Sequence, residues 1–151
     1  MHPRLWPRLS LKALSHWLPP LAWSLVIIGF SGELGSAQQT LGIIRGLLEL
    51  IPGLTPDQMM WLHGLTRKAG NLLGYALLAF LWLRLLAGHL RLRRGRAAAV
   101  ALGLCLAIAL IDEGHQTQLD SLTGSLWDVA LDMTGAILAA GLTLSRRRPR
   151  H

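Results

Sequence analysis

The chain has 151 residues, enough for one domain, of which 52% are hydrophobic and 15% are charged. A soluble domain carries about a quarter charged residues. The formal net charge of +7 comes from short basic clusters between long apolar runs, whereas a nucleic-acid-binding protein presents its basic residues on a soluble scaffold. Composition therefore excludes a soluble domain and a nucleic-acid partner, and it indicates an integral membrane protein.

Four apolar runs predict four transmembrane helices. A helix needs about 20 mostly apolar residues to cross a hydrocarbon core about 30 Å thick. The runs cover residues 14–30, 69–88, 97–111 and 126–144. We therefore predict an all-α fold, a four-helix membrane bundle that residues 1–151 form as a single domain. Pro19 and Pro20 interrupt the first run, so this helix is expected to begin at Pro20 or to bend there.

The first run has a second interpretation, as part of a signal peptide. Residues 1–37 combine a basic start, an apolar middle and the small residues Gly35, Ser36 and Ala37 as a cleavage site. Cleavage there would leave three spans and place the mature N-terminus outside the cell. Both interpretations stay open, and the retained span is the preferred one.

The distribution of Lys and Arg predicts the orientation of the spans. Only Arg45, Arg67 and Lys68 are expected on one side of the membrane, and the other 12 of the 15 basic residues on the opposite side. Those twelve are Arg4, Arg8, Lys12, Arg84, Arg91, Arg93, Arg94, Arg96, Arg146, Arg147, Arg148 and Arg150. Because cytoplasmic loops are enriched in Lys and Arg, both termini are expected in the cytoplasm. Anchoring of this topology is the simplest role of the clusters, and binding of anionic lipid headgroups would be an additional one.

The outer segment, residues 31–66, is predicted to contain a short amphipathic helix. Apolar residues recur there at helical spacing, at Leu41, Ile44, Leu48 and Ile51. Such a helix lies on the outer leaflet or across the end of the bundle. A second helix is predicted to start after Thr55, because Thr55 suits the N-cap, Pro56 the first helical position and Gln58 the capping box. This second helix is expected to run on into the second span.

Polar residues gather at the outer ends of the second, third and fourth spans. Arg67, Asn71 and Tyr75 follow one another at i, i+4 spacing and share one stripe, and Lys68 is within reach of Asn71. The third and fourth spans add Asp112, Glu113, His115, Gln116, Ser125, Asp128 and Asp132. The spacing of Ser125, Asp128 and Asp132 also puts these three on one helix face.

Asp132 lies deepest among these residues, roughly 10 Å along the helix from Ser125. A carboxylate in the membrane costs about 3 kcal/mol on insertion scales. Asp132 is therefore expected to face the bundle and to find a partner, and Arg67 and Lys68 are the only basic residues near the spans on this side. The polar set forms either an outward-opening pocket for a cation or a polar headgroup, or interhelical ion pairs that stabilise the bundle. We favour the pocket, because intramembrane ionisable groups are seldom present for stability alone.

No metal or other cofactor is predicted. His115 and His63 are the candidate metal ligands or proton carriers on this side, and one histidine beside two carboxylates is a weak pattern for a metal. A hydrogen-bonded interfacial histidine is the simpler interpretation. Cys105, the single cysteine, lies in an apolar run, so neither a disulfide nor a cysteine-based metal site can form within the chain.

The fourth span also carries a set of small residues, Gly135 and Gly141 with Ala136, Ala139 and Ala140. They predict a small-residue face for close packing against another helix.

Taken together, these polar motifs resemble the VanZ-like family of small bacterial membrane proteins, across most of the chain. The basic pair Arg67-Lys68 precedes a polar position and Tyr75 on the second span, and the third span ends in Asp112-Glu113 followed by His115-Gln116. Thr123-Gly124-Ser125, Asp128, Asp132 and Gly135-Ala136 complete the pattern. The family commonly has His at the position of Asn71 and Arg at that of Leu122, so this chain lacks a titratable group and a cation there.

The resemblance implies a role in the cell envelope, in the cytoplasmic membrane of a bacterium, rather than a defined reaction. The family takes its name from low-level resistance to the glycopeptide teicoplanin. The first hypothesis is a protein whose outward pocket binds a lipid headgroup or a cell-wall precursor group, with membrane lipids as partners and a contribution to glycopeptide tolerance.

Two other classes of function stay open. In an intramembrane hydrolase or transferase acting on lipid-linked substrates, Glu113 or Asp128 would be the general base and His115 a proton shuttle. This hypothesis lacks a convincing nucleophile. A small transporter would need an oligomer of the four-span chain, and the clustering of acidic residues at one end argues against a continuous pathway.

Overall fold

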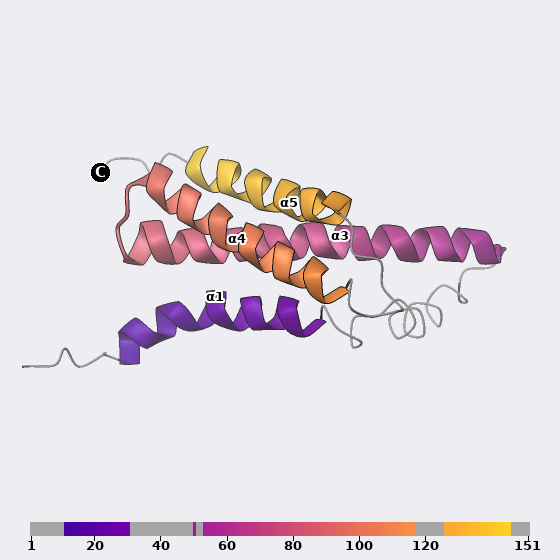
Figure 1. Cartoon of the computed structure of the whole chain (residues 1–151), viewed down its shortest axis with the longest axis horizontal. Coiled ribbons are helices and arrows are strands. Elements are labelled where there is room, and N and C mark those ends of the chain that lie inside the picture. The colour runs from indigo at the N-terminus through magenta and orange to yellow at the C-terminus, as the bar shows by residue number, and fades with distance from the viewer. Residues whose placement is uncertain (1–10, 31–49, 51–52, 117–125, 146–151) are drawn as a thin grey trace, which may run out of the picture.

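The computed structural model describes residues 11–30, 50, 53–116 and 126–145. All regular elements in this part of the chain are helices (Figure 1). They are α1 (Leu11–Phe30), α3 (Pro56–Leu83), the π-helical turn η2 (Arg84–His89), α4 (Arg94–Gln116) and α5 (Leu126–Ser145). The predicted all-α bundle is confirmed. The amphipathic helix predicted around Leu41–Ile51 lies outside the described residues, apart from Leu50.

Among the described residues, three helices are long and apolar enough to cross a membrane: Pro56–His89, Arg94–Gly114 and Leu126–Ser145. They contain the second, third and fourth predicted spans. The apolar stretch of α1, Leu14–Phe30, is shorter than these, so its crossing of the membrane stays a prediction.

The start of α3 forms the predicted capping box. The Thr55 hydroxyl accepts a hydrogen bond from the backbone N–H of Gln58 at 3.3 Å, and the Gln58 side chain accepts one from the N–H of Thr55 at 2.9 Å. Two backbone donors that the first turn would leave unpaired are satisfied in this way. The helix then continues into the second span, and its first turns extend beyond the ends of α4 and α5 (Figure 1).

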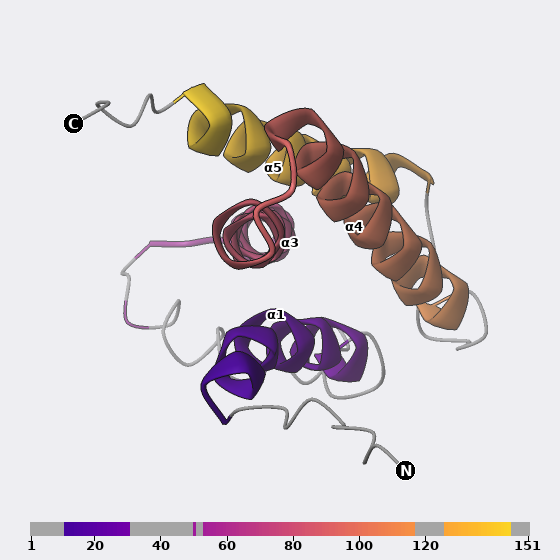
Figure 2. The same ribbon diagram turned by 90° about the vertical axis from the view of Figure 1, so that its left-hand side faces the viewer.

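Helix α1 begins at Leu11 and runs through Pro19 and Pro20, so it does not begin at Pro20. Pro20 is fully buried, and the packing of its ring offsets the backbone hydrogen bond that a proline cannot donate. The Trp23 indole Nε1 donates to the carbonyl oxygen of Gly74 at 2.9 Å, which attaches α1 to α3. In Figure 2, α3 lies between α1 on one side and the α4–α5 pair on the other.

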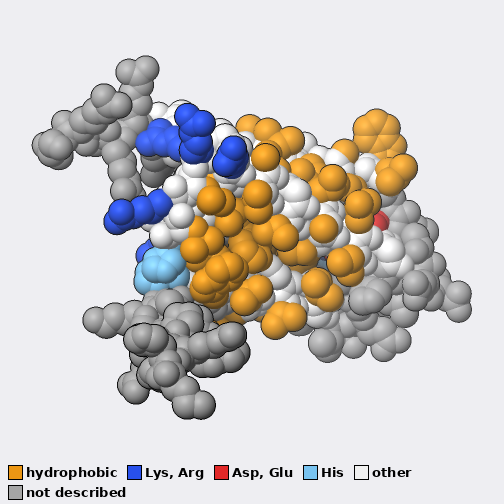
Figure 3. Space-filling view, turned by 60° about the vertical axis from the view of Figure 1, so that its left-hand side comes forward, with side chains coloured by type: hydrophobic (Ala, Val, Ile, Leu, Met, Phe, Trp, Pro, Cys, Tyr) orange, Lys and Arg blue, Asp and Glu red, His pale blue; other side chains and the backbone are white. Residues whose placement is uncertain are grey.

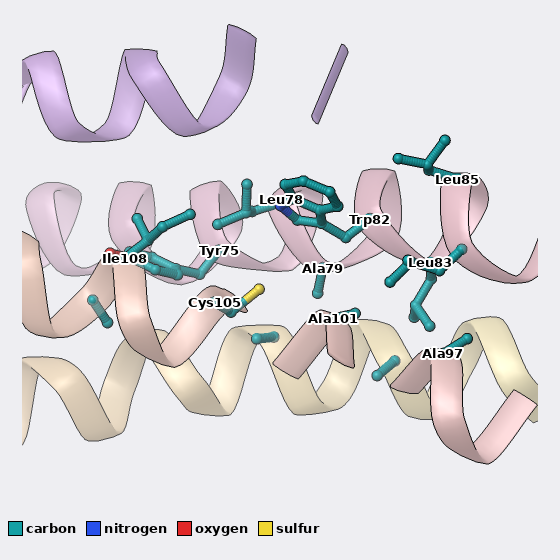
Figure 4. Packing of buried hydrophobic residues seen from close by; sticks show 14 of the residues in the cluster. Tyr75, Leu78, Ala79, Trp82, Leu83, Leu85, Ala97, Ala101, Cys105 and Ile108 are labelled. Carbon is teal, nitrogen blue, oxygen red and sulfur yellow. The ribbon is translucent and has the colours of Figure 1, made fainter. Parts of the chain in front are cut away.

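The core lies where α3, α4 and α5 meet (Figure 4). Large buried side chains come mainly from α3, including Tyr75, Leu78 and Leu83, whereas α4 contributes a stripe of smaller ones at i, i+4 spacing. That stripe is Ala97, Ala101, Cys105 and Ala109. Small side chains let helix backbones approach closely, which drives association within a membrane.

Helices α3 and α5 approach each other closely at Gly135. A Cβ atom added at Gly135 would lie 2.1 Å from the carbonyl oxygen of Leu72 in α3, so only glycine fits there. The predicted small-residue face is present at Gly135, Ala136 and Ala140, which are buried. The prediction was wrong for Gly141, which is exposed. Six residues turn a helix by roughly 600° at 3.6 residues per turn, so Gly141 points well away from Gly135.

Candidate functional site

The candidate site is a group of buried acidic residues at the end of the bundle where α4 finishes and α5 begins. Asp112 and Glu113 come from α4 and Asp132 from α5, with exposed fractions of 5%, 7% and 0%. Tyr75 of α3, 1% exposed, donates a hydrogen bond from its hydroxyl to Asp112 Oδ2 over 3.5 Å. Three helices therefore contribute side chains to one buried polar cluster.

The helical spacing of the sequence explains how these side chains meet. Tyr75 lies three residues after Leu72, and Asp132 lies three residues before Gly135, so each is about one turn from the Leu72–Gly135 contact. The close approach of α3 and α5 at that contact keeps this part of the bundle tight. The acidic cluster thus lies beside a contact of α3 and α5 that admits only glycine.

Asp132 is fully buried and, among the described residues, lacks the hydrogen bonds that a buried carboxylate needs. Within the part of the chain that the structure describes, neither of its carboxylate oxygens has a hydrogen-bond partner. The negative charges of Asp112, Glu113 and Asp128 act on it electrostatically. A buried carboxylate without a donor costs several kcal/mol. Asp132 therefore marks a place where donated hydrogen bonds or positive charge would stabilise the protein.

The basic and amide residues of α3 extend from this cluster toward the start of the helix. Asn71 and Arg67 are half-buried, and Lys68 is exposed. Arg67 is eight residues from Tyr75, or roughly 12 Å along the helix, and it donates no hydrogen bond to Asp132. Arg67 thus lies nearer the start of α3 than the acidic residues do, rather than among them.

One further residue belongs to this stripe, His63, whose role the sequence alone did not define. It is buried, and the positive charge of Arg67 acts on it. His63 precedes Arg67 by four residues, so the spacing that joined Arg67, Asn71 and Tyr75 extends to it directly. Continuing the stripe by one step toward the N-terminus would have placed His63 on the same face.

Of the other predicted site residues, one lies at the edge of the cluster and three have side chains outside the described part of the chain. Asp128 lies one turn from Asp132 and is half-buried. His115 and Gln116 belong to the last turn of α4, and their side chains lie outside the described part, as does Ser125. The structure therefore brings together Tyr75, Asp112, Glu113 and Asp132, with Asp128 at the edge. In the described ranges, no group of three or more His, Cys, Asp or Glu side chains could hold a metal ion.

Comparison with known proteins identifies a family. The profile described as VanZ/LLP1 matches residues 17–147, which is nearly the whole chain. No curated protein and no solved structure matches the chain significantly.

Proposed function

The chain belongs to the VanZ/LLP1 family, and from this premise we propose that this membrane protein binds, in an outward-facing polar pocket, the headgroup of an envelope lipid or of a lipid-linked cell-wall precursor. The observation that carries the proposal is the complete burial of Asp132 without a hydrogen-bond partner among the described residues. Buried ionisable groups in membrane helices mark sites of function by default.

The chemistry of the pocket defines the kind of headgroup. Asp112 and Asp132 accept hydrogen bonds from hydroxyl, amide or ammonium groups, and such bonds to a charged acceptor are stronger than those between neutral groups. Arg67, which lies roughly 12 Å along α3 from Tyr75, suits a phosphate or carboxylate. A headgroup that carries an anionic group at one end and hydroxyl or amine donors at the other matches this order. Phospholipids with an amine and lipid-linked cell-wall sugars both have that arrangement.

The basic residues at the opposite end support an outward orientation of the pocket. Arg84, Arg91, Arg93, Arg94 and Arg96 lie at or near the turn between α3 and α4. The enrichment of cytoplasmic loops in Lys and Arg supports a cytoplasmic position for this turn in a bacterial inner membrane, with both termini on the same side. The acidic pocket then opens outward, where binding of a cell-wall precursor group would contribute to glycopeptide tolerance.

The experiment compares ligand binding by Asp132→Asn with that by the unchanged protein. The probes are a polyprenyl-pyrophosphate-linked peptidoglycan precursor and phosphatidylethanolamine, each added to the purified full chain in detergent. Loss of a charge-assisted hydrogen bond is expected to weaken binding of the preferred probe about tenfold or more. Asp57→Asn is the matched control, because Asp57 is an exposed carboxylate on α3. Equal binding by Asp132→Asn and the unchanged protein would refute the proposal.

The enzymatic hypothesis concerns the same residues, and a turnover assay distinguishes it from binding alone. Glu113 or Asp128 would act as the base of a hydrolase or transferase on the bound lipid. Incubation of the same labelled precursor with the protein, followed by chromatography of the lipid, detects any product. Binding without product supports a binding protein, and product that depends on Glu113 supports the enzyme.

A further inference from the structure

A second site lies at the opposite end of the bundle, between the η2 turn and the end of α5. A cavity of about 390 Å³ is present there, within the range of about 300–1,000 Å³ usual for small-ligand pockets. Phe80, Leu83 and Ala87 give it apolar walls, and Arg84 and Arg94 supply two cationic groups. None of these residues takes part in the acidic pocket.

The π-helical geometry of η2 shapes this cavity. The N–H of Leu90 bonds to the carbonyl oxygen of Leu85, five residues back, at 2.9 Å, instead of four residues back as in an α-helix. The chain then reverses through Arg91, whose φ of 54° lies in the left-handed region. This turn returns α4 along the bundle and places Arg94 opposite Arg84. Wide single turns of this kind occur frequently at functional sites.

Arg94 is held in place and still has donors to offer. Its Nη1 donates to the carbonyl oxygen of Leu144, in the last turn of α5, at 3.2 Å. A guanidinium group has five N–H donors, so this bond uses only one of them. Arg84 lines a second cavity of about 200 Å³ on the α1 side as well, beside His16 and Pro20. Arg84 thus lines both cavities.

The charge at this end is not balanced by acidic residues of the described part. Figure 3 shows Lys and Arg side chains gathered at one end of the molecule, beside histidine, with the visible acidic side chain at the other end. Asp132 is roughly 18 Å along α5 from Leu144, and Asp112 roughly 27 Å along α4 from Arg94, at 1.5 Å per residue. The two arginines of the cavity therefore favour an anion from outside the chain.

We propose that this cavity binds the phosphate group of an anionic phospholipid of the surrounding bilayer, with Arg84 and Arg94 on the phosphate. The apolar walls distinguish a lipid from a free phosphate ion, because Phe80, Leu83 and Ala87 offer contact to acyl or glycerol carbons and no further donors. Arg is suited to the phosphate because its planar guanidinium presents two N–H groups to two oxygens. The proposal is independent of the acidic pocket, since it uses different residues at the other end.

The test measures lipid retained by the purified full chain in native mass spectrometry. Phosphatidylglycerol and phosphatidylcholine with identical acyl chains are supplied in equal amounts, and preferential retention of phosphatidylglycerol is expected. Arg84→Gln is expected to lower that retention about tenfold, as for loss of a charge-assisted pair. Arg96→Gln is the matched control, because Arg96 is exposed, lies two residues from Arg94 and does not line the cavity.

The outcomes separate a built site from a general surface charge. Equal losses with Arg84→Gln and Arg96→Gln would overturn the proposal, because any cation near a membrane surface attracts anionic lipid to a similar extent. Displacement of the lipid by inorganic phosphate at similar concentration would overturn the assignment to a lipid. Arg84→Lys serves if the Gln variant does not fold. It keeps the charge but not the paired donors, so unchanged retention with Lys would also overturn the proposal.

Discussion

The substitution Gly135→Ala tests the packing on which the acidic site depends. The added Cβ would lie 2.1 Å from the Leu72 carbonyl oxygen, and real Cβ atoms are essentially never found closer than 3.0 Å to such a neighbour. Helices α3 and α5 would have to separate by at least the difference, 0.9 Å, along that line. The obstacle is backbone, which cannot rotate away as a side chain does.

The expected destabilisation follows from this geometry. Overpacking by a single methyl group costs about 1–3 kcal/mol when side chains can adjust, and a backbone obstacle places Gly135→Ala at or above about 3 kcal/mol. Gly141→Ala is the matched control on the same helix, because a Cβ there meets no atom within 4 Å. Alanine is also the better helix former by about 1 kcal/mol, so this control is expected to be neutral or stabilising.

The assay is thermal unfolding of both variants in the same detergent, followed by circular dichroism. A clearly lower midpoint for Gly135→Ala than for Gly141→Ala is expected. Because Tyr75 and Asp132 are each about one turn from the contact, binding of the headgroup proposed above should fall as well. Equal midpoints for the two variants would show that α3 and α5 are not packed as the structure has them.

Two further predictions concern single hydrogen bonds. Trp23→Phe removes the bond to the Gly74 carbonyl and is expected to lower stability by about 1 kcal/mol; the unfolding midpoint measures this, and a loss no greater than that of Trp17→Phe would contradict the role given to the indole. Tyr75→Phe removes the bond to Asp112, which at 3.5 Å is long, so a loss below about 1 kcal/mol is expected in the same assay. A loss several times larger would show that Tyr75 contributes more than this bond.

Local chemistry made parts of the fold predictable. Thr55, Pro56 and Gln58 satisfy the backbone donors of a helix start by themselves, so their order in the chain was sufficient to place the beginning of α3. The cost of a carboxylate in an apolar span likewise required Asp132 to lie inside the bundle. Such inferences need no knowledge of which helix lies beside which.

Features that depend on the partner helix were not predictable in the same way. Gly135 and Gly141 look alike in the sequence, and only the position of Leu72 on α3 makes one of them irreplaceable. The cavity beside η2 also needs the distant residues Arg84, Arg94 and Leu144 to meet. Helical spacing in the sequence gives the direction in which a side chain points around the helix axis, but not the residue that it contacts on another helix.

The length of the helix from Pro56 to His89 has a consequence for the response of the protein to its bilayer. At 1.5 Å per residue its 34 residues span about 51 Å, against a hydrocarbon thickness of about 30 Å. A thinner bilayer is accommodated by a greater tilt of such a helix. A tilt of about 10° about the His89 end would move the Pro56 end sideways by about 9 Å. Bilayer thickness would then affect the sideways position of Arg67 over the acidic residues. The access of the proposed headgroup to those residues would change with it.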